Sequence, residues 1–241
     1  FVSANAPWHP IRFYEEIIKE TMNKFLLTLW NIYSFFATYA PLDNFDLKKD
    51  WVPMDSRGFL DKWLVSRLNH LIEDIEDKIS RFELHKAARS LEEFVINDFS
   101  NWYIRCSRKR FWAEEATPDK YAGYSTFYHC LITLSQLVAP FVPFISDYIY
   151  QNMGETESVH LQDYPTSNKA HINISLEEKM REARKIVELS RSLRAKACIK
   201  LRHPLSRGII VSDIDLANLE DILKDELNVK EILFESSCDP Y

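Results

Sequence analysis

The sequence predicts a mainly α-helical protein, an antiparallel helix bundle followed by a small C-terminal β-α-β appendage of the α+β type. Apolar residues recur every three or four positions over long stretches, which is the spacing of one helix face. Only 4 of the 241 residues are glycine, whereas average usage would give roughly 17. A β-sandwich needs many tight turns, so this composition disfavours that fold.

Four long helices and one short helix make up the predicted bundle. The first begins at Pro10 and ends at Pro41, because proline fits the first turn of a helix but interrupts its interior. A linker without apolar periodicity follows, from Asp43 to Arg57. The other predicted helices run from Gly58 to about Ile79, from about Leu84 to Trp112, from Thr117 to Val138, and from the break at Ala139–Phe144 to about Gly154.

A change in the sequence pattern after Pro165 predicts two domains, a bundle over residues 1–165 and a second part over 166–241. The second part begins with a helix from Leu176 to Ala197. Short apolar runs then predict strands over 207–211 and 229–234, with a helix over 216–227 between them, and the two strands need not be neighbours.

Helical periodicity also predicts which residues face inward on two of these helices. For the helix from Leu84 they are Ala88, Leu91, Val95, Phe99, Trp102 and Cys106. For the helix from Leu176 they are Met180, Ala183, Val187, Ser190 and Leu193.

The net charge of −6 conceals an uneven distribution. Residues 213–241 contain nine acids and two lysines, a net charge of −7, which leaves +1 on the preceding 212 residues. Basic residues gather in two places, Arg105 to Arg110 and the acid-free stretch from Leu189 to Ser212. Because salt screens charges beyond about 8–10 Å, local fields rather than the total decide whether a polyanion binds. An acidic total therefore does not exclude RNA.

The first basic cluster predicts a binding site for single-stranded RNA. On a helix, Arg105, Arg108, Lys109 and Trp112 share one flank, with Arg110 beside them. Guanidinium groups bind phosphates bidentately, and an exposed indole stacks on an unpaired base. The competing interpretation places the tryptophans in the core and pairs the arginines with carboxylates.

The second basic stretch extends this predicted track with Arg191, Arg194, Lys196, Lys200 and Arg202. Part of that charge has an alternative explanation, since cations at a helix C-terminus are stabilised by the helix dipole.

Motifs for catalysis or metal binding are not found in the sequence. The glycines are too scattered for a phosphate-binding loop, no HExxH or GxSxG pattern occurs, and the cysteines Cys106, Cys130, Cys198 and Cys238 form no CxxC pair. We therefore expect no catalytic residue, no metal and reduced thiols. With no signal peptide and no apolar run of membrane length, we expect a cytoplasmic fragment of a longer protein.

Phrases spread over nearly the whole chain resemble the C-terminal part of isoleucyl-tRNA synthetases, which are class I aminoacyl-tRNA ligases. Those phrases are SANAPWHPIRF (Ser3 to Phe13), LWNIYSFFATYAPLD (Leu29 to Asp43), LDKWLVSRLN (Leu60 to Asn69), SNWYIRCSRKRFW (Ser100 to Trp112), LVAPFVPFISDYIYQ (Leu137 to Gln151), ESVHLQDYP (Glu157 to Pro165) and ACIKLRHPLSR (Ala197 to Arg207). Valyl and leucyl relatives share versions of WNxxxF and APFxPF, so those two phrases alone identify only the subgroup.

The resemblance implies a bundle of the class I synthetase anticodon-binding type, with residues 1–10 entering from a preceding catalytic part. It implies a tRNA partner, isoleucine-specific, and neither DNA nor a membrane, for a monomeric cytoplasmic protein. No HIGH-like or KMSKS-like motif occurs in the chain, so ATP and Mg²⁺ are expected in the absent catalytic domain and not here. Some family members end in a zinc module, which the cysteine spacing here does not match.

Two alternatives to this reading stay open from the sequence. One is the same region of a valyl-type relative. The other is a helical module that binds a partner protein without RNA, which the acidic segment after Asp213 fits equally well.

Overall fold

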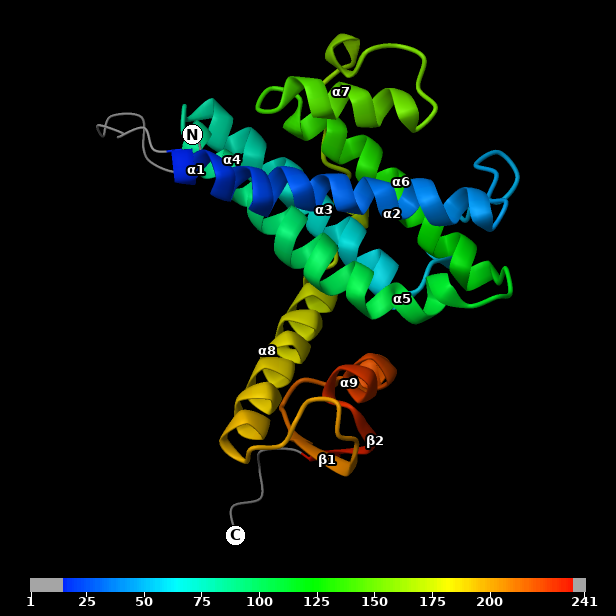
Figure 1. Cartoon of the computed structure of the whole chain (residues 1–241), viewed down its shortest axis with the longest axis vertical. Coiled ribbons are helices and arrows are strands. Elements are labelled where there is room, and N and C mark those ends of the chain that lie inside the picture. Colours follow the sequence, from blue (N-terminus) through cyan, green and yellow to red (C-terminus); the bar gives the residue numbers. More distant parts are fainter. Residues whose placement is uncertain (1–14, 236–241) are drawn as a thin grey trace. The chain divides into compact units, whose positions relative to one another are not determined.

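A computed structural model of the chain describes residues 15–235, which form two compact units (Figure 1). The first unit ends at Ile172 and the second begins at Asn173. The predicted entry segment 1–10 and the predicted helix start at Pro10 lie outside the described residues.

The first unit is the helix bundle that the sequence predicts (Figure 1). Its helices are α1 (Glu15–Thr21), α2 (Leu27–Leu42), α3 (Phe59–Ser80), α4 (Leu84–Glu93), α5 (Arg105–Trp112), α6 (Pro118–Val138) and α7 (Pro143–Asn152). Pro41 lies in the last turn of α2, one residue before the helix ends. Thr117 caps α6 by accepting a hydrogen bond from the Lys120 backbone N–H at 3.2 Å.

Two π-helical stretches were not predicted. Met22–Leu26 joins α1 to α2, and Phe94–Ile104 joins α4 to α5 into one continuous rod. A π-helix bonds residue i to i+5 and has wider turns than an α-helix, so its inward face drifts along the sequence. From Tyr103 near the end of the second stretch onward, the buried residues are Tyr103, Ser107 and Phe111.

The inward residues predicted for this rod are therefore partly wrong at its ends. Leu91, Val95, Phe99 and Trp102 are buried as predicted. Ala88 and Cys106 are only half-buried, and Ala87 and Ser107 occupy the inward positions in their place.

An aromatic cluster fills the centre of the first unit around Phe127 of α6. The Phe127 ring lies 5.0 Å from that of Phe99, 5.5 Å from Phe111 and 5.7 Å from Phe35, measured between centroids. Burying one such side chain contributes about 1.5–3 kcal/mol, and a favourable aromatic pair adds about 0.5–1.5 kcal/mol. This cluster ties α2, α5 and α6 to the π-helical stretch between α4 and α5.

The second unit is a helix followed by a β-α-β element. It consists of α8 (Ile174–Lys196), β1 (Leu205–Val211), α9 (Glu220–Leu227) and β2 (Val229–Glu235). The two strands are neighbours and run parallel, with Leu205 opposite Val229 and Val211 opposite Glu235.

Of the inward residues predicted on α8, Leu193 is wrong and Ser190 is only half-buried. Met180, Ala183 and Val187 are buried, but the Leu193 side chain is 64% exposed and Arg194 is buried next to it. The cause is a set of backbone carbonyls that Arg194 binds, as described below.

The boundary between the units lies after Ile172, not after Pro165 as the sequence indicated. The intervening residues pack on α3 of the first unit. The Asn168 backbone N–H donates to Asn69 Oδ1 at 2.7 Å, and the Ser167 hydroxyl donates to the Glu73 carboxylate at 3.3 Å. These polar contacts, between residues nearly a hundred positions apart, are not visible in a local sequence pattern.

Gly123 of α6 gives a test of how closely α6 packs against α5. A Cβ atom at position 123 would lie 2.8 Å from Arg110 Nη2 and 2.9 Å from Phe111 Cζ. Because both neighbours are held in place, we expect Gly123→Ala to destabilise the first unit by about 1–3 kcal/mol, measured by urea unfolding. The control is Gly58→Ala, whose added Cβ would lie 3.5 Å from its nearest neighbour and should cost at most about 1 kcal/mol. Equal losses in the two variants would contradict this account.

Candidate nucleic-acid interface

Helix α5 carries the first predicted basic cluster, some of whose side chains are exposed to solvent while others are buried in the fold. Arg108, Lys109 and Trp112 are exposed, and Trp112 is 58% accessible. Arg105 is half-buried on the same flank. Ser107 and Phe111, spaced four residues apart, anchor the opposite face in the core. The exposed face formed by Arg105, Arg108, Lys109 and Trp112 is hereafter called the α5 face.

Arg108 and Trp112 form a cation–π pair on the α5 face. The Arg108 guanidinium carbon lies 6.0 Å from the centroid of the indole ring. Arg108 makes no ion pair with any residue between 15 and 235. By contrast Trp102 is buried, with Arg105 5.4 Å from its ring centroid. The competing interpretation is therefore right for Trp102, which belongs to the core, but Trp112 offers its indole to solvent.

Arg110 does not belong to the exposed surface, contrary to the prediction. Its Nη1 donates to Asp61 Oδ2 at 2.8 Å and its Nη2 to Asp61 Oδ1 at 2.9 Å. Nη2 also donates to the Tyr103 hydroxyl at 2.9 Å, and that hydroxyl donates to Asp61 Oδ1 at 2.5 Å. Asp61 is fully buried. Arg110, Asp61 and Tyr103, called the Arg110 cluster below, fix α5 to α3.

The charges of the Arg110 cluster are set by burial and by mutual contact. Burial opposes the charged form of Arg110, but Tyr103 and Asp61 beside it outweigh that effect and raise its pKa. Burial, together with Asp61, raises the pKa of Tyr103 well above its usual range. The phenol thus keeps its proton and remains a hydrogen-bond donor. Arg110 is consequently a structural cation and is not available to phosphate.

A second buried cation, Lys120, secures the end of α5, and the sequence analysis missed it. Its Nζ donates to the Ala113 carbonyl at 2.7 Å and pairs with Asp43 Oδ2 at 2.6 Å. Ala113 is the C-cap of α5, so Lys120 holds the turn that carries Trp112. One signal could have revealed it, because Lys120 lies in the first turn of α6, where the helix dipole disfavours a cation.

The second basic stretch lies in the second unit, and it too contains both engaged and exposed cations. Arg191 pairs with Glu226 of α9 at 2.9 Å. Arg194 is buried, and its guanidinium donates to the carbonyls of His203 and Leu227 at 2.8 Å each. Only the last three predicted residues, Lys196, Lys200 and Arg202, are exposed.

Contrary to the prediction of a free basic track, Arg191 and Arg194 are both held by contacts within the second unit. The sequence analysis noted that no acid lies within the stretch itself. The acid that pairs with Arg191 comes from α9, 35 positions away, and Arg194 binds carbonyls instead of carboxylates.

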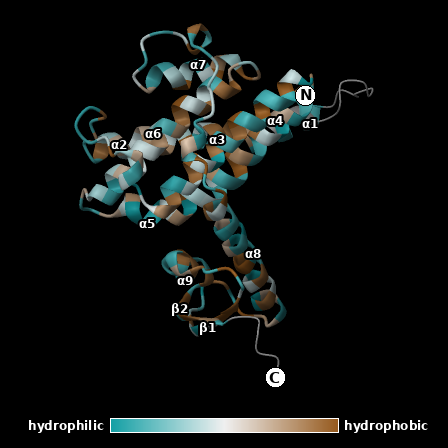
Figure 2. Cartoon of the chain, turned by 180° about the vertical axis from the view of Figure 1, so that it is seen from behind, coloured by the Kyte–Doolittle hydropathy of each residue, from teal (hydrophilic) through white to brown (hydrophobic). Residues whose placement is uncertain are grey.

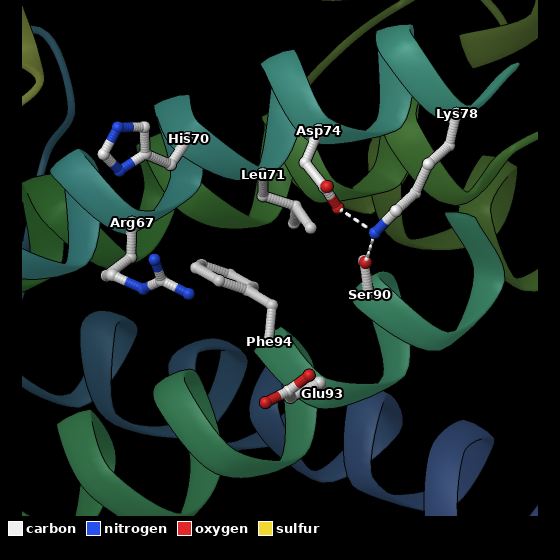
Figure 3. Close-up of a pocket in the computed structure, with 8 residues that line it drawn as sticks. All are labelled: Arg67, His70, Leu71, Asp74, Lys78, Ser90, Glu93 and Phe94. Carbon is white, nitrogen blue, oxygen red and sulfur yellow. Dashed lines mark hydrogen bonds and ion pairs between the residues drawn. The ribbon is translucent and has the colours of Figure 1, made fainter. Parts of the chain in front are cut away.

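A pocket of about 420 Å³ lies between α3 and the rod that begins with α4 (Figure 3). The arginine and the lysine that line this pocket are both paired with acids. Arg67 Nε lies 3.1 Å from Asp98 Oδ2, and Lys78 Nζ lies 2.6 Å from Asp74 Oδ2. Lys78 also donates to the Ser90 hydroxyl at 2.6 Å. With its cations matched by carboxylates, this pocket suits a phosphate less well than the α5 face does.

Two further findings concern metals and membranes. Within residues 15–235, no group of three or more His, Cys, Asp or Glu side chains is placed to hold a metal ion. None of the described helices is both long enough and apolar enough to span a membrane.

The Arg110 cluster gives a prediction about stability. Asp61→Asn keeps the shape of the side chain but leaves the buried Arg110 charge with only the long, 3.4 Å contact to the exposed Asp119 carboxylate, and losing one partner of a buried pair costs about 3–5 kcal/mol. We expect urea unfolding to show a destabilisation of that size. The control is Asp77→Asn, which removes an exposed 2.8 Å ion pair with Arg81 and should cost less than about 1 kcal/mol. If Asp61→Asn behaves like the control, the cluster does not hold α5.

A family model described as the anticodon-binding domain of tRNA ligase matches residues 61–209. The isoleucine–tRNA ligase of Clostridium tetani is 44% identical, over 100% of this chain and 24% of that protein. The isoleucine–tRNA ligase of Methanothrix thermoacetophila is 42% identical, over 96% of this chain and 23% of that protein.

Among solved structures, the LeuRS of Agrobacterium radiobacter in a ternary complex with tRNA and LeuAMS covers 71% of this chain and 19% of that chain, with 16% identity and a TM-score of 0.48. The chain spans about a quarter of the length of the curated relatives it matches, 24% in the case of the Clostridium tetani protein. Since the family model covers more than half of its residues, the chain belongs to the anticodon-binding domain family of tRNA ligases.

Proposed function

We propose that this chain is the tRNA anticodon-arm-binding region of an isoleucine–tRNA ligase, a protein that attaches isoleucine to its tRNA using ATP. The observation that carries the proposal is the α5 face, where Arg108, Lys109 and Trp112 are exposed on a helix fixed from behind. The names of the relatives support isoleucine as the amino acid.

The α5 face combines the two interactions that an RNA loop offers. Arg108 and Lys109 bind backbone phosphates, with Arg105 at the flank. Trp112 stacks on an unpaired base, and such stacking is worth about 1–3 kcal/mol per base. The Arg110 cluster and Lys120 hold the helix before RNA arrives, so little conformational entropy is lost on binding.

The exposed cations of the second unit, Lys196, Lys200 and Arg202, supply further phosphate contacts along the stem. Arg194 contributes indirectly, because its bonds to the carbonyls of Lys200 and His203, at 3.4 and 2.8 Å, hold the loop that carries two of these cations.

Chemistry is assigned to the rest of the longer protein. Amino-acid activation, ATP and Mg²⁺ belong to the domain with HIGH-like and KMSKS-like motifs, which this sequence lacks. The role of the present region is to use binding energy at the anticodon arm to position the distant acceptor end. The proposal includes a monomer acting in the cytoplasm.

The phosphate contacts are tested by the double substitution Arg108→Ala/Lys109→Ala. Each lost contact to a loop phosphate should flatten the dependence of log K on log salt by about 0.7. We therefore expect weaker binding of isoleucine tRNA and a shallower slope in fluorescence anisotropy titrations at several salt concentrations.

The control for that experiment is Arg81→Ala/Lys86→Ala, which removes two exposed cations, one at the end of α3 and one in the first turn of α4. An unchanged slope in the α5 variant would contradict the RNA proposal and favour a protein-binding module. Equal affinity for a valine tRNA would instead favour the valyl-type alternative.

The stacking contact is tested at Trp112. Trp112→Ala should weaken RNA binding by about 1–3 kcal/mol at every salt concentration, because stacking displaces no counterions, and Trp112→Phe should restore part of the loss. The control is Phe144→Ala, which removes an aromatic side chain of α7 that is 90% exposed. Equal effects of Trp112→Ala and Phe144→Ala would rule out specific stacking at Trp112.

A further inference from the structure

The sign of the exposed charge changes at the C-terminal end of α5. The α5 face begins at Arg105, and Trp112 ends the helix about 10 Å further along its axis. Figure 2 shows the hydrophilic colouring of this helix. The next two charged residues, Glu114 and Glu115, are acids, and both are exposed. Neither glutamate forms a side-chain hydrogen bond or an ion pair with another residue between 15 and 235.

The turn that precedes the two glutamates sets their position. Ala113 leaves the helix in an extended conformation, with φ −60° and ψ 139°. Its carbonyl accepts a hydrogen bond from the buried Lys120 at 2.7 Å, so the turn is fixed on α6. Because consecutive Cα atoms are about 3.8 Å apart, the Cα atom of Glu114 lies within about 8 Å of that of Trp112. The glutamates are therefore neighbours of a base that stacks on the indole.

The glutamate side chains next to Trp112 are hydrogen-bond acceptors. Ionised carboxylates accept hydrogen bonds and donate none. The last turn of a helix adds backbone carbonyl oxygens, and it is the negative end of the helix dipole. Acids at this end repel phosphate, so they direct an RNA backbone toward Arg105 and Arg108 and leave a base edge beside the carboxylates.

A carboxylate in this position discriminates between unpaired bases by the N–H groups of their Watson–Crick edges. Guanine has two adjacent donors there, N1–H and N2–H, which match the two oxygens of one carboxylate. Cytosine and adenine each have one amino donor beside an acceptor nitrogen, and uracil has one N–H between two carbonyl oxygens. A carboxylate therefore binds guanine at two points and is repelled by an acceptor of each other base.

We propose that Glu114 and Glu115 select guanine as the unpaired base that stacks on Trp112. The α5 face by itself binds RNA loops of any sequence, because phosphate contacts and stacking carry little sequence information. Two acids beside that face weaken such general binding, and the gain that their position offers is discrimination between bases. The proposal rests on the proposed function and extends it from RNA binding to base recognition.

Hairpin RNAs that share one stem and a loop of uridines test the proposal. A single guanine, or a single adenine, is placed at each loop position in turn, and affinities are measured by fluorescence anisotropy. We expect one position at which guanine binds about 5- to 150-fold more tightly than adenine, the range of a good bidentate contact. Glu114→Gln/Glu115→Gln should reduce that ratio to less than about threefold, because the Gln amide donates as well as accepts.

The control is Glu76→Gln/Glu178→Gln, which removes two exposed acids from α3 and α8 and changes the net charge equally. It should leave the guanine ratio unchanged. A guanine ratio near one at every position, or one that Glu114→Gln/Glu115→Gln leaves unchanged, would overturn the base selection. Salt-dependent binding of the hairpins would in that case still support RNA binding by the α5 face. If no hairpin shows salt-dependent binding, the proposed function itself fails, and the base selection fails with it.

Discussion

The structure of the first unit depends on one buried interaction, the two-point ion pair between Arg110 and Asp61. Asp61 is fully buried, so loss of Arg110 would leave its charge without water, and loss of Asp61 would leave Arg110 only a 3.4 Å contact with the exposed Asp119. Tyr103 completes the site by donating to Asp61 at 2.5 Å, and the absence of a side chain on Gly123 gives the guanidinium its space. The helix that bears the candidate RNA contacts is thereby fixed in rotation as well as in position.

Neighbouring cations on α5 have opposite roles for a geometric reason. Arg108 and Arg110 are two residues apart, which places them on opposite sides of a helix. Arg110 faces a carboxylate in a medium that strengthens the pair, whereas Arg108 faces water, where its charge is screened and exchangeable. A cation that faces water is free to pair with a phosphate, whereas a cation held in a buried ion pair is not. The buried Arg110 cluster thus supports the α5 face that is proposed to bind RNA.

The second unit repeats this arrangement with different partners. Arg194 binds four backbone carbonyls, those of Lys200, His203, Leu227 and Asn228, and so joins the end of α8 to the loop before β1 and the turn before β2. Its inward position displaces Leu193 to the surface.

The sequence alone determined the helical bundle, the β-α-β element, the family resemblance and the place of the basic clusters, because these follow from local periodicity, proline and glycine positions, and short phrases. Trp112 and Arg108, two of the residues that the sequence proposed for RNA binding, are exposed in the structure. Only the tertiary structure decided that Arg110, Arg191 and Arg194 are engaged within the fold, since their partners Asp61, Glu226 and the carbonyl of Leu227 are 49, 35 and 33 positions away. Local patterns specify which face of a helix is apolar. They do not specify which distant carboxylate or carbonyl a cation meets, and they did not predict the π-helical stretch after which Ser107, in place of Cys106, is buried.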